Sequence, residues 1–360
     1  MVTPNSCARP SASRREGSVG LKYTAIRAVF EALWLSRLPA LTRTLSSCRG
    51  VIFTLHRVLP DTPAPFSPNA ILQVRPDFLD YCIERVRALD IDIITLDEAM
   101  ERLRKPKAVR RFAVFTFDDA YRDNLEYALP ILRRQDCPFT LYVPTGLVDG
   151  EGELWWQALE DIIAANNEVV ANNERLATAT LADKQQAFDT LYWRMRKMPE
   201  PDRLQLLYRL AAHHGFDLAD QCRRLIMDWS ELRQFADDPL CTIGAHTVKH
   251  YELAKLPPDE AREEIAHSVD ILGAKFGKRP RHFSYPLGGP LSAGEREFDL
   301  ARELGLATAV TTRPGGLYPH HRETPTALPR VSLNGLFQER RYVDVFASGA
   351  VFTWLGRMNG

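Results

Sequence analysis

The stretch FAVFTFDDAYRDN, residues 112–124, joins an apolar run to two adjacent carboxylates. Residues 112–117 contain no charged side chain, a pattern typical of a strand that is covered on both faces. Asp118 and Asp119 follow at the end of this strand, where α/β folds place their active sites. Successive side chains on extended backbone point in different directions, so one carboxylate can bind a metal while the other has a separate role. A helix N-cap is the alternative explanation for the pair, since Asp is preferred there.

Similar strand-like runs alternate with helical patterns on both sides of this stretch. Such alternation indicates parallel strands joined by helical crossovers. The periodicity fits a closed barrel or a doubly wound sheet equally well. The expected strands are 51–55, 91–95, 112–117, 139–143, 241–245, 282–285 and 307–311, and the expected helices are 77–89, 96–104, 121–134, 258–276 and 295–304.

Other segments depart from this alternation. Residues 150–238 have helical patterning without a clear strand and carry four of the six tryptophans, which predicts a helical insertion on one loop. Residues 1–20 are rich in Ser, Pro and Arg and predict a disordered tail. Residues 21–49 predict a basic amphipathic helix, and residues 336–360 a C-terminal helical segment. The apolar stripe of the N-terminal helix comprises Tyr23, Ile26, Val29, Phe30 and Leu33.

The composition is that of a soluble globular protein, with 45% hydrophobic and 26% charged residues. It excludes a disordered chain, a collagen-like fibre and a coiled-coil rod. Because 46 basic residues balance 46 acidic ones, no overall field recruits nucleic acid. The balance hides an asymmetry: residues 1–50 hold eight basic and two acidic side chains, a net charge of +6.

Nothing in the sequence predicts secretion or a membrane span. The six cysteines are scattered without a C-x-x-C pair, which predicts reduced thiols. No apolar run reaches the ~18 residues that a spanning helix needs, and the N-terminus lacks a typical signal peptide, so we expect a cytoplasmic protein. The basic helix within residues 21–45 could lie on the inner face of an anionic membrane. The alternative is that this helix packs against the domain beneath it, which is the commoner arrangement.

Two further segments carry histidines at the ends of expected strands. In GAHTVKH, residues 244–250, His246 and His250 have the i, i+4 spacing that lets two imidazoles on one helical turn reach a single metal. His56 follows the strand in VIFTLHRV, residues 51–58. If the strands are parallel, these histidines share one rim with the carboxylates. One carboxylate and two imidazoles leave open coordination positions, which is the pattern of a catalytic metal rather than a structural one.

These segments resemble the polysaccharide deacetylase family, also described as the NodB-homology or carbohydrate esterase 4 group. FTFDDAYRDN resembles the family's first motif (TFDDGY), GAHTVKH its second (H-S/T-x-x-H), and FSYPLGG, residues 283–289, a form of its third. VIFTLHRV resembles the element of a permuted branch in which the catalytic histidine comes early. The resemblance covers residues 50–335 and implies an α/β fold: a distorted (β/α)7-type barrel with a helical insertion.

The resemblance also implies roles for individual residues. Asp119, His246 and His250 would hold a divalent metal, with Zn²⁺ the best match and Co²⁺ or Ni²⁺ able to replace it. Asp118 would be the general base and His56 the general acid. Backbone N–H groups within residues 285–288 would help to hold the oxyanion.

The implied substrate is an N-acetylated sugar within an oligo- or polysaccharide, from which the acetyl group is removed by hydrolysis. Trp155, Trp156 and Tyr285 are the candidate sugar-binding aromatics, with core packing the alternative for each tryptophan. The sequence departs from the family at Ala120, where a glycine is usual. The usual third-motif arginine is also absent, and Arg330 is the candidate that would replace it at the substrate site by orienting the catalytic Asp.

Two other functions remain open at this point. Paired carboxylates and histidines also serve metal-dependent phosphoesterases, although the sequence lacks a second set of metal ligands. A catalytically silent carbohydrate-binding or membrane-docked relative is the other alternative. The complete set of Asp118, Asp119, His246, His250 and His56 argues against loss of activity.

Overall fold

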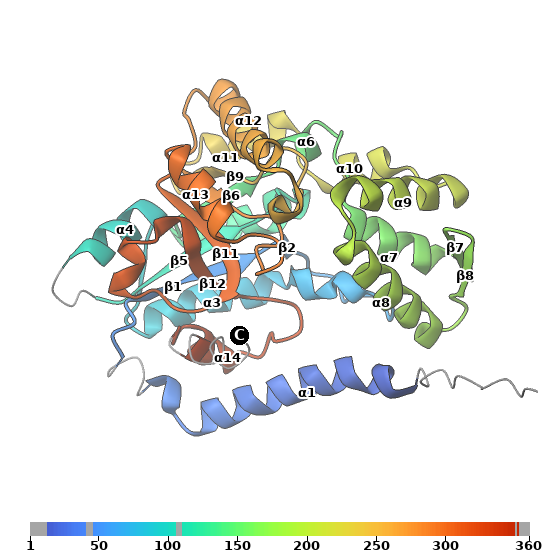
Figure 1. The fold of residues 1–360 in the computed structure, drawn as a ribbon. Helices are drawn as coiled ribbons and strands as arrows, with labels where there is room; N and C mark the ends of the chain where they lie inside the picture. Colours follow the sequence, from blue (N-terminus) through green and yellow to red (C-terminus); the bar gives the residue numbers. More distant parts are fainter. Residues whose placement is uncertain (1–12, 41–45, 106–109, 350, 353–360) are drawn as a thin grey trace, which may run out of the picture.

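The computed structural model describes residues 13–40, 46–105, 110–349 and 351–352. Of the disordered tail expected at residues 1–20, residues 1–12 lie outside these described residues, whereas residues 13–20 belong to the N-terminal helix. Figure 1 shows a barrel with helices around it, a helical lobe on one side, and a long N-terminal helix along the lower edge.

Seven parallel strands form a closed barrel, as the family resemblance implied. The ring closes where β1 pairs with β5 along its whole length, from Gly50 opposite Phe112 to Leu55 opposite Phe117. A short strand, β4 (Asp92–Ile93), pairs with the start of β5. In order around the barrel the strands are β1 (Gly50–Leu55), β12 (Leu328–Ser332), β11 (Thr308–Pro314), β10 (His282–Ser284), β9 (Cys241–Ala245), β6 (Phe139–Val143) and β5 (Phe112–Phe117).

The barrel strands are buried on both sides. All residues of β1, β5 and β6 are buried. One hydrophobic cluster brings together Ile52, Val114, Tyr142, Val310 and Leu328 from five different strands, which can meet only inside the ring. The alternate residues face outward and pack under the helices, so the continuous apolar runs of the sequence have a direct physical cause.

Helices cover the outside of the barrel. The expected helix over residues 121–134 begins as a π-helical turn, Asn124–Ala128, before it continues as α5. The surrounding helices are α3 (Pro76–Ala88), α4 (Leu96–Arg104), α5 (Leu129–Arg134), α6 (Thr145–Val148), α11 (Trp229–Ala236), α12 (Pro258–Phe276) and α13 (Glu295–Glu303). Short elements complete the loops: η1 (Pro68–Leu72), η3 (Leu253–Lys255), η4 (Pro319–Arg322), η5 (Pro325–Ala327) and the paired strands β2 (Arg57–Val58) and β3 (Gln73–Val74).

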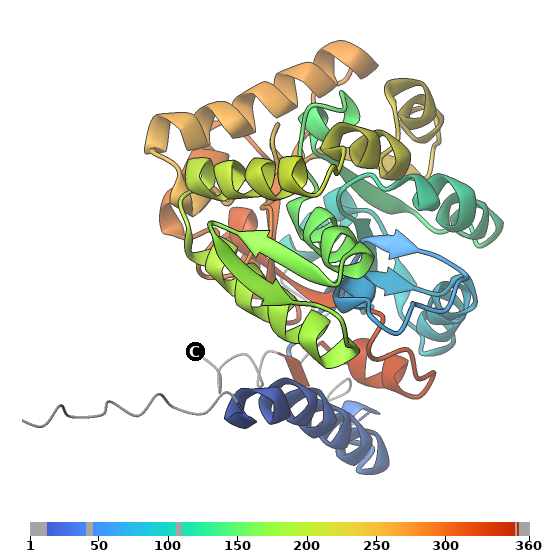
Figure 2. The same cartoon turned by 90° about the vertical axis from the view of Figure 1, so that its right-hand side faces the viewer.

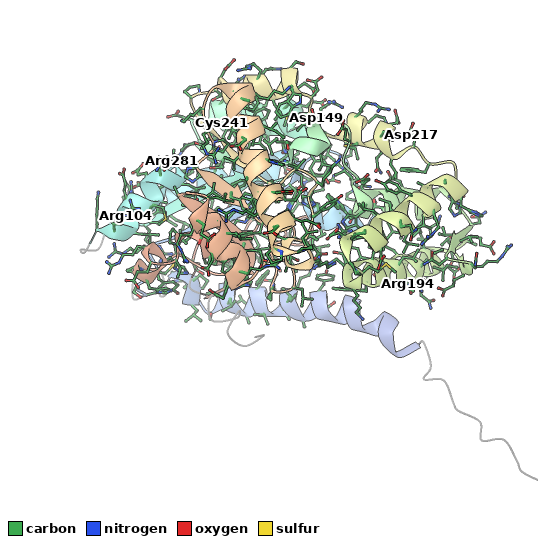
Figure 3. The ribbon with its side chains drawn as sticks, turned by 45° about the horizontal axis from the view of Figure 1, so that its top comes forward. Arg104, Asp149, Arg194, Asp217, Cys241 and Arg281 are labelled. Carbon is green, nitrogen blue, oxygen red and sulfur yellow. The ribbon has the colours of Figure 1, made fainter. Side chains whose placement is uncertain are left out.

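The insertion stands beside the barrel as a separate lobe in Figure 1, and the lobe faces the viewer in Figure 2. Contrary to the expectation of helices alone, it contains a β-hairpin. Asn172 and Asn173 both have positive φ, as a tight hairpin turn requires. Side chains fill the space between lobe and barrel (Figure 3). The elements of the lobe are α7 (Trp155–Ala165), β7 (Glu168–Ala171), β8 (Glu174–Ala177), α8 (Leu181–Lys197), α9 (Glu200–His213) and α10 (Leu218–Leu225).

The two ends of the described chain pack against each other. The N-terminal helix α1 (Ser13–Leu35) begins before the residue 21 that the sequence predicted. Its Phe30 makes edge-on ring contacts with Phe337, Tyr342 and Phe346, the last two within α14 (Tyr342–Phe346). None of the described helices combines the length and the hydropathy needed to cross a bilayer.

Candidate metal centre and active site

The histidines and carboxylates that the sequence predicted as site residues line one small cavity. Asp118, Asp119, His246, His250 and His56 all follow the carboxyl ends of barrel strands and line a cavity of about 110 Å³. Parallel pairing explains the convergence, because the carboxyl ends of β1, β5 and β9 meet at one rim. The remaining lining residues are Asn69, Ile71, Leu72, Trp156, Tyr192, Leu287 and Thr312.

Asp119, His246 and His250 form a cluster of three metal-ligand side chains. The Asp119 carboxylate oxygen Oδ1 lies 3.3 Å from Nε2 of His246 and 3.2 Å from Nε2 of His250. One ligand atom from each residue lies within 4.8 Å of the others, and all three residues are buried. Among the described residues, this oxygen has no hydrogen-bond donor.

The donor set fits a cation. Nδ1 of His246 lies 2.6 Å from the backbone carbonyl of Ser284 and can donate to it, which leaves the Nε2 lone pair of a neutral ring facing Asp119. Burial lowers the pKa of His250. Burial opposes ionisation of Asp119, but the neighbouring histidines outweigh it and hold the pKa of this carboxyl well below its ordinary value. An ionised carboxylate and neutral imidazoles that converge on one point are what a divalent metal requires.

The two motif loops have strained backbone. Asp119 and Ala120 have φ of 74° and 57°, and Thr247 and His250 have φ of 64° and 57°. The second motif is therefore a loop and not the helical turn that its i, i+4 spacing predicted. The Thr247 hydroxyl accepts the N–H of His250 at 2.9 Å, which fixes this loop. Non-glycine residues in the left-handed region are costly and cluster at functional sites.

Asp118 is held by a buried arginine. Arg330 donates to both carboxylate oxygens, at 2.8 and 2.7 Å, and the Ser284 hydroxyl adds a third hydrogen bond at 3.2 Å. Burial disfavours the charged carboxylate, but Arg330 outweighs it and lowers the pKa of Asp118. Arg330 is thus placed to orient Asp118. It is itself fully buried and does not line the cavity, so the prediction that Arg330 binds substrate directly is wrong.

The first motif also holds the His56 segment, a role that sequence reasoning missed. Asn124 donates to the backbone carbonyl of His56 at 2.9 Å. The Asp123 carboxylate accepts from Arg57 at 2.8 Å and from the N–H of Val58 at 2.9 Å. Both residues stand in the FTFDDAYRDN motif, but only the pairing of β1 with β5 shows that they face the His56 loop.

The insertion supplies one aromatic wall of the cavity. The Trp156 ring lies 4.8 Å from the His250 ring, and its indole N–H donates to the Tyr121 hydroxyl at 3.1 Å. Tyr192 of α8 also lines the cavity and was not predicted. The Asn69 amide donates to the backbone carbonyl of Trp156 at 2.8 Å and so ties the insertion to the loop that follows β1.

Trp155 and Tyr285 do not line the cavity, so the prediction that they bind the sugar is wrong. Trp155 is buried against Tyr192 and under Arg203, because successive residues of a helix point to different sides. Tyr285 is fully buried, and its hydroxyl donates to the carbonyl of Thr326 at 2.8 Å.

The expected backbone donors in the third motif are also largely engaged. The N–H of Tyr285 donates to the carbonyl of Val310 and that of Gly288 to Pro286. Pro286 has no N–H. Within residues 285–288, this leaves the backbone N–H of Leu287, whose side chain lines the cavity.

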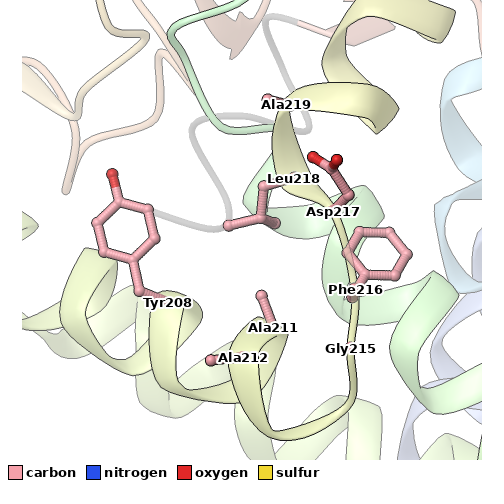
Figure 4. A pocket seen from close by; sticks show the side chains of 8 residues that line it. All are labelled: Tyr208, Ala211, Ala212, Gly215, Phe216, Asp217, Leu218 and Ala219. Atoms are coloured by element: carbon pink, nitrogen blue, oxygen red, sulfur yellow. The ribbon is translucent and has the colours of Figure 1, made fainter.

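A second hollow, of about 510 Å³, lies on the insertion between α9 and α10 (Figure 4). Tyr208, Phe216 and Leu218 line it together with Asp217. The Asp217 carboxylate accepts the N–H of Asp220 and caps α10, so its role is structural. The lining has no group of metal ligands, which leaves the rim cavity as the candidate site.

Comparison with known proteins points to one family. The family model described as "Polysaccharide deacetylase" matches residues 105–309. The YxkH protein of Bacillus subtilis (strain 168), whose name carries that of the same family, is 32% identical over 87 residues. This match covers 22% of the chain and 30% of YxkH.

Two solved structures share the fold. Streptococcus pyogenes deacetylase PplD, solved in complex with acetate, is 17% identical with a TM-score of 0.51, and IcaB from Ammonifex degensii is 18% identical with a TM-score of 0.53. Each match covers 82% of this chain and 97% of the other. The family model spans more than half of the residues and includes Asp118, Asp119, His246 and His250. The chain therefore belongs to the polysaccharide deacetylase family.

Proposed function

We propose that the protein is a metal-dependent hydrolase that removes acetyl groups from N-acetylated sugars of an oligo- or polysaccharide. One observation carries the proposal: the buried Asp119–His246–His250 cluster, the arginine-held Asp118 and His56 line a single cavity. Family membership supports the same chemistry.

The three clustered residues are the proposed metal ligands. A divalent cation bound there would polarise the acetyl carbonyl and lower the pKa of a water molecule. The mixed nitrogen and oxygen donor set suits Zn²⁺ best, and Co²⁺ or Ni²⁺ would also fit. Because the ligands come from the loops after β5 and β9, the barrel itself fixes their separation.

Asp118 is the proposed general base. Arg330 and Ser284 keep its carboxylate ionised and fix its orientation at the cavity, so it can accept a proton from the attacking water. A positioned base of this kind typically contributes about 10²–10⁴-fold to the rate. Asp119 cannot exchange roles with it, because its carboxylate faces the two histidines.

His56 is the proposed general acid. It lines the same cavity, and Asn124 and Asp123 hold the backbone around it. From there the imidazole can donate a proton to the departing amine nitrogen as the C–N bond breaks, which yields acetate and a free amino sugar.

The cavity walls support a sugar derivative over a phosphoester. Trp156 and Tyr192 offer aromatic rings to an apolar sugar face. Of the residues that the structure describes, no Arg or Lys lines the cavity, and a transferring phosphoryl group would need such a cation.

Acetate release from a panel of acetylated glycans tests the proposal. The panel contains chitin oligosaccharides and O-acetylated xylan, and the Asp118→Asn variant is the matched control. We expect release from the amide substrates by the zinc-loaded protein, and at least a ~100-fold loss in Asp118→Asn with its metal retained. Near-wild-type release by Asp118→Asn would contradict the base assignment. Release from xylan alone would contradict the amide substrate.

A further inference from the structure

The rim cavity is too small to enclose an oligosaccharide. Its volume is about 110 Å³, whereas a site that encloses a whole ligand usually measures ~300–1,000 Å³. When an acetylated sugar places its acetyl group at the cluster of Asp119, His246 and His250, the neighbouring sugars of the same chain therefore lie outside the cavity. The residues on the surface beside the cavity decide whether those sugars are bound.

Trp193 is an exposed aromatic side chain directly beside the cavity. It follows Tyr192 in α8, and the Tyr192 side chain lines the cavity. The centroids of the two rings are 5.4 Å apart, and the ring planes are perpendicular. Tryptophan is highly buried on average, yet Trp193 is 55% exposed. A large aromatic surface is thus open to solvent at a distance of one ring from the cavity wall.

The contacts of Arg196 show which way this part of α8 faces. Arg196 lies three residues after Trp193 and four after Tyr192, so the three side chains are neighbours on the helix surface. Arg196 lies 3.2 Å from the carboxylate of Glu252 and 3.4 Å from the hydroxyl of Ser292. Glu252 follows the second motif, and Ser292 follows the third motif. The surface around Trp193 therefore adjoins the two motif loops.

A second exposed apolar side chain lies on one of these loops. Leu291 precedes Ser292 and is 74% exposed. Leu287 of the same loop lines the cavity. Exposed apolar side chains thus adjoin the cavity on two separate elements, α8 and the loop after β10, which contact each other through Arg196. Single exposed apolar residues are common, but apolar surface gathered beside a cavity marks a binding site.

A sugar ring is the occupant that suits this surface. The C–H groups of a pyranose ring form an apolar face that can stack on an indole, while its hydroxyls require polar partners at the ring edge. Asp189 and Lys197 lie four residues before and four residues after Trp193, so they flank its ring along the helix. The glycosidic bond to the sugar in the cavity keeps the next sugar of the chain close to this surface.

We propose that Trp193 is the stacking platform of a second sugar subsite, which binds a sugar adjacent to the one that is deacetylated. This inference rests on the proposed deacetylase function and adds a preference for oligosaccharides over single N-acetylated sugars. Stacking at a ring that does not react holds the substrate and the transition state equally. The subsite therefore acts on KM and not on kcat.

Kinetics and calorimetry with the chitin trisaccharide test the subsite. Trp193→Ala should raise KM for acetate release from the trisaccharide roughly tenfold, with kcat within about twofold of the wild type. Its effect on kcat/KM for single N-acetylglucosamine should be smaller. In the Asp118→Asn background, which cannot turn over, Trp193→Ala should raise the calorimetric Kd for the trisaccharide by a similar factor. Trp193→Phe keeps a ring and should recover part of both losses.

Leu181→Ala is the matched control. Leu181 begins the same helix, has the same exposed fraction of 55%, and lies about three helical turns from Trp193. Equal KM and Kd values for Trp193→Ala and Leu181→Ala would overturn the subsite and leave the proposed deacetylation intact. A loss of kcat at unchanged KM would also overturn it. A wild-type protein that binds the trisaccharide through Trp193 but releases no acetate would instead overturn the proposed function and support the subsite.

Discussion

Asp118 and Asp119 are neighbours in the chain, yet they have different partners. Asp118 meets Arg330 and Ser284, whereas Asp119 meets His246 and His250. The separation arises because Asp119 has a positive φ, which turns the chain sharply after β5. Adjacent carboxylates can therefore carry two roles without sharing a proton.

The pairing of Arg330 with Asp118 predicts a specific energetic coupling. Arg330→Met should destabilise the fold by about 3–5 kcal/mol, because it leaves a buried carboxylate without its counter-ion. Adding Asp118→Asn to it should recover part of that loss, since the amide carries no charge. Urea unfolding of the two single variants and the double variant measures the coupling. Strictly additive effects would show that the two side chains do not interact as described.

Ala120 gives a second prediction at this scale. Its φ of 57° is costly for alanine and easy for glycine, the residue usual in the family. We expect Ala120→Gly to raise the free energy of unfolding by up to about 1 kcal/mol without loss of activity. Ala128→Gly is the control, because Ala128 has helical dihedrals and should lose stability instead. A destabilised Ala120→Gly protein would contradict the strained turn.

His321 predicts a pH dependence of stability. Burial lowers the pKa of His321 to about 4, and its Nδ1 accepts the N–H of Tyr318, which only the neutral ring can do. In the unfolded chain, His321 binds a proton near the ordinary histidine pKa of about 6.5. The contribution of neutral His321 to the free energy of unfolding is therefore complete above pH ~6.5 and is lost as the pH falls toward ~4.

We expect His321→Asn, which keeps an acceptor, to lose less stability than the wild type between neutral and mildly acidic pH. Urea midpoints at several pH values provide the measurement, and the difference between the two proteins removes the effect of all other groups. Parallel curves for the two proteins would show that His321 does not titrate on unfolding.

Sequence motifs predicted which side chains converge, but not which aromatics face the cavity. Asp118, Asp119, His246, His250 and His56 follow strand ends, and parallel pairing brings strand ends together. Trp155 and Trp156 are equally aromatic in sequence and both are buried, and only the direction of α7 decides that Trp156 lines the cavity and Trp155 does not. Tyr192 lines the cavity because α8 passes beside it, and no local sequence pattern predicts that position of α8.

At the scale of elements, a buried ion network joins the insertion to the second motif. Glu252, two residues beyond His250, is fully buried and contacts Arg203 of α9 at 3.2 Å and Arg196 of α8 at 3.2 Å. Glu200 pairs with Arg203 and accepts the N–H of Glu252. The lobe that carries Trp156 is thus fixed to the loop that carries His250.

This network predicts that Arg203 acts on the site from a distance. Arg203→Met should lower stability by about 3–5 kcal/mol, because buried Glu200 loses its ion-pair partner and Glu252 keeps only Arg196 and Lys255. It should also weaken zinc affinity, since the His250 loop is less constrained. Arg194→Met is the control, because Arg194 pairs with Glu174 at the surface, where ion pairs contribute about 0–1 kcal/mol. Unchanged zinc affinity in folded Arg203→Met would confine the network to a structural role.

The elements that the sequence missed share a physical explanation. Pro329 and Arg330 interrupt the apolar pattern of β12, although Leu328, Arg330 and Val331 are buried. The β7–β8 hairpin is short and largely polar on one strand, so its main signal is the Asn172–Asn173 turn. The continuous apolar strands, in contrast, were located to within a few residues because both of their faces are covered.

At the scale of the whole molecule, the strand pattern alone could not show whether the strands form a closed barrel or an open sheet. Seven strands that close through the β1–β5 pairing put all motif loops on one rim, whereas an open sheet would separate β1 from its partner on one side. The family resemblance resolved this choice. It covered residues 50–335 and gave no expectation for α1, whose Phe30 packs against Tyr342 and Phe346 of α14.

Metal removal and return is the most direct test of a metal-dependent deacetylase. The full-length protein is stripped with a chelator, and acetate release and bound zinc are measured together as zinc is added back. We predict that activity returns in proportion to metal up to one ion per chain. Asp118→Asn should bind the ion and stay inactive, and His246→Ala should lose both. Full activity of the stripped protein, or undiminished zinc binding by His246→Ala, would contradict the assignment of this centre.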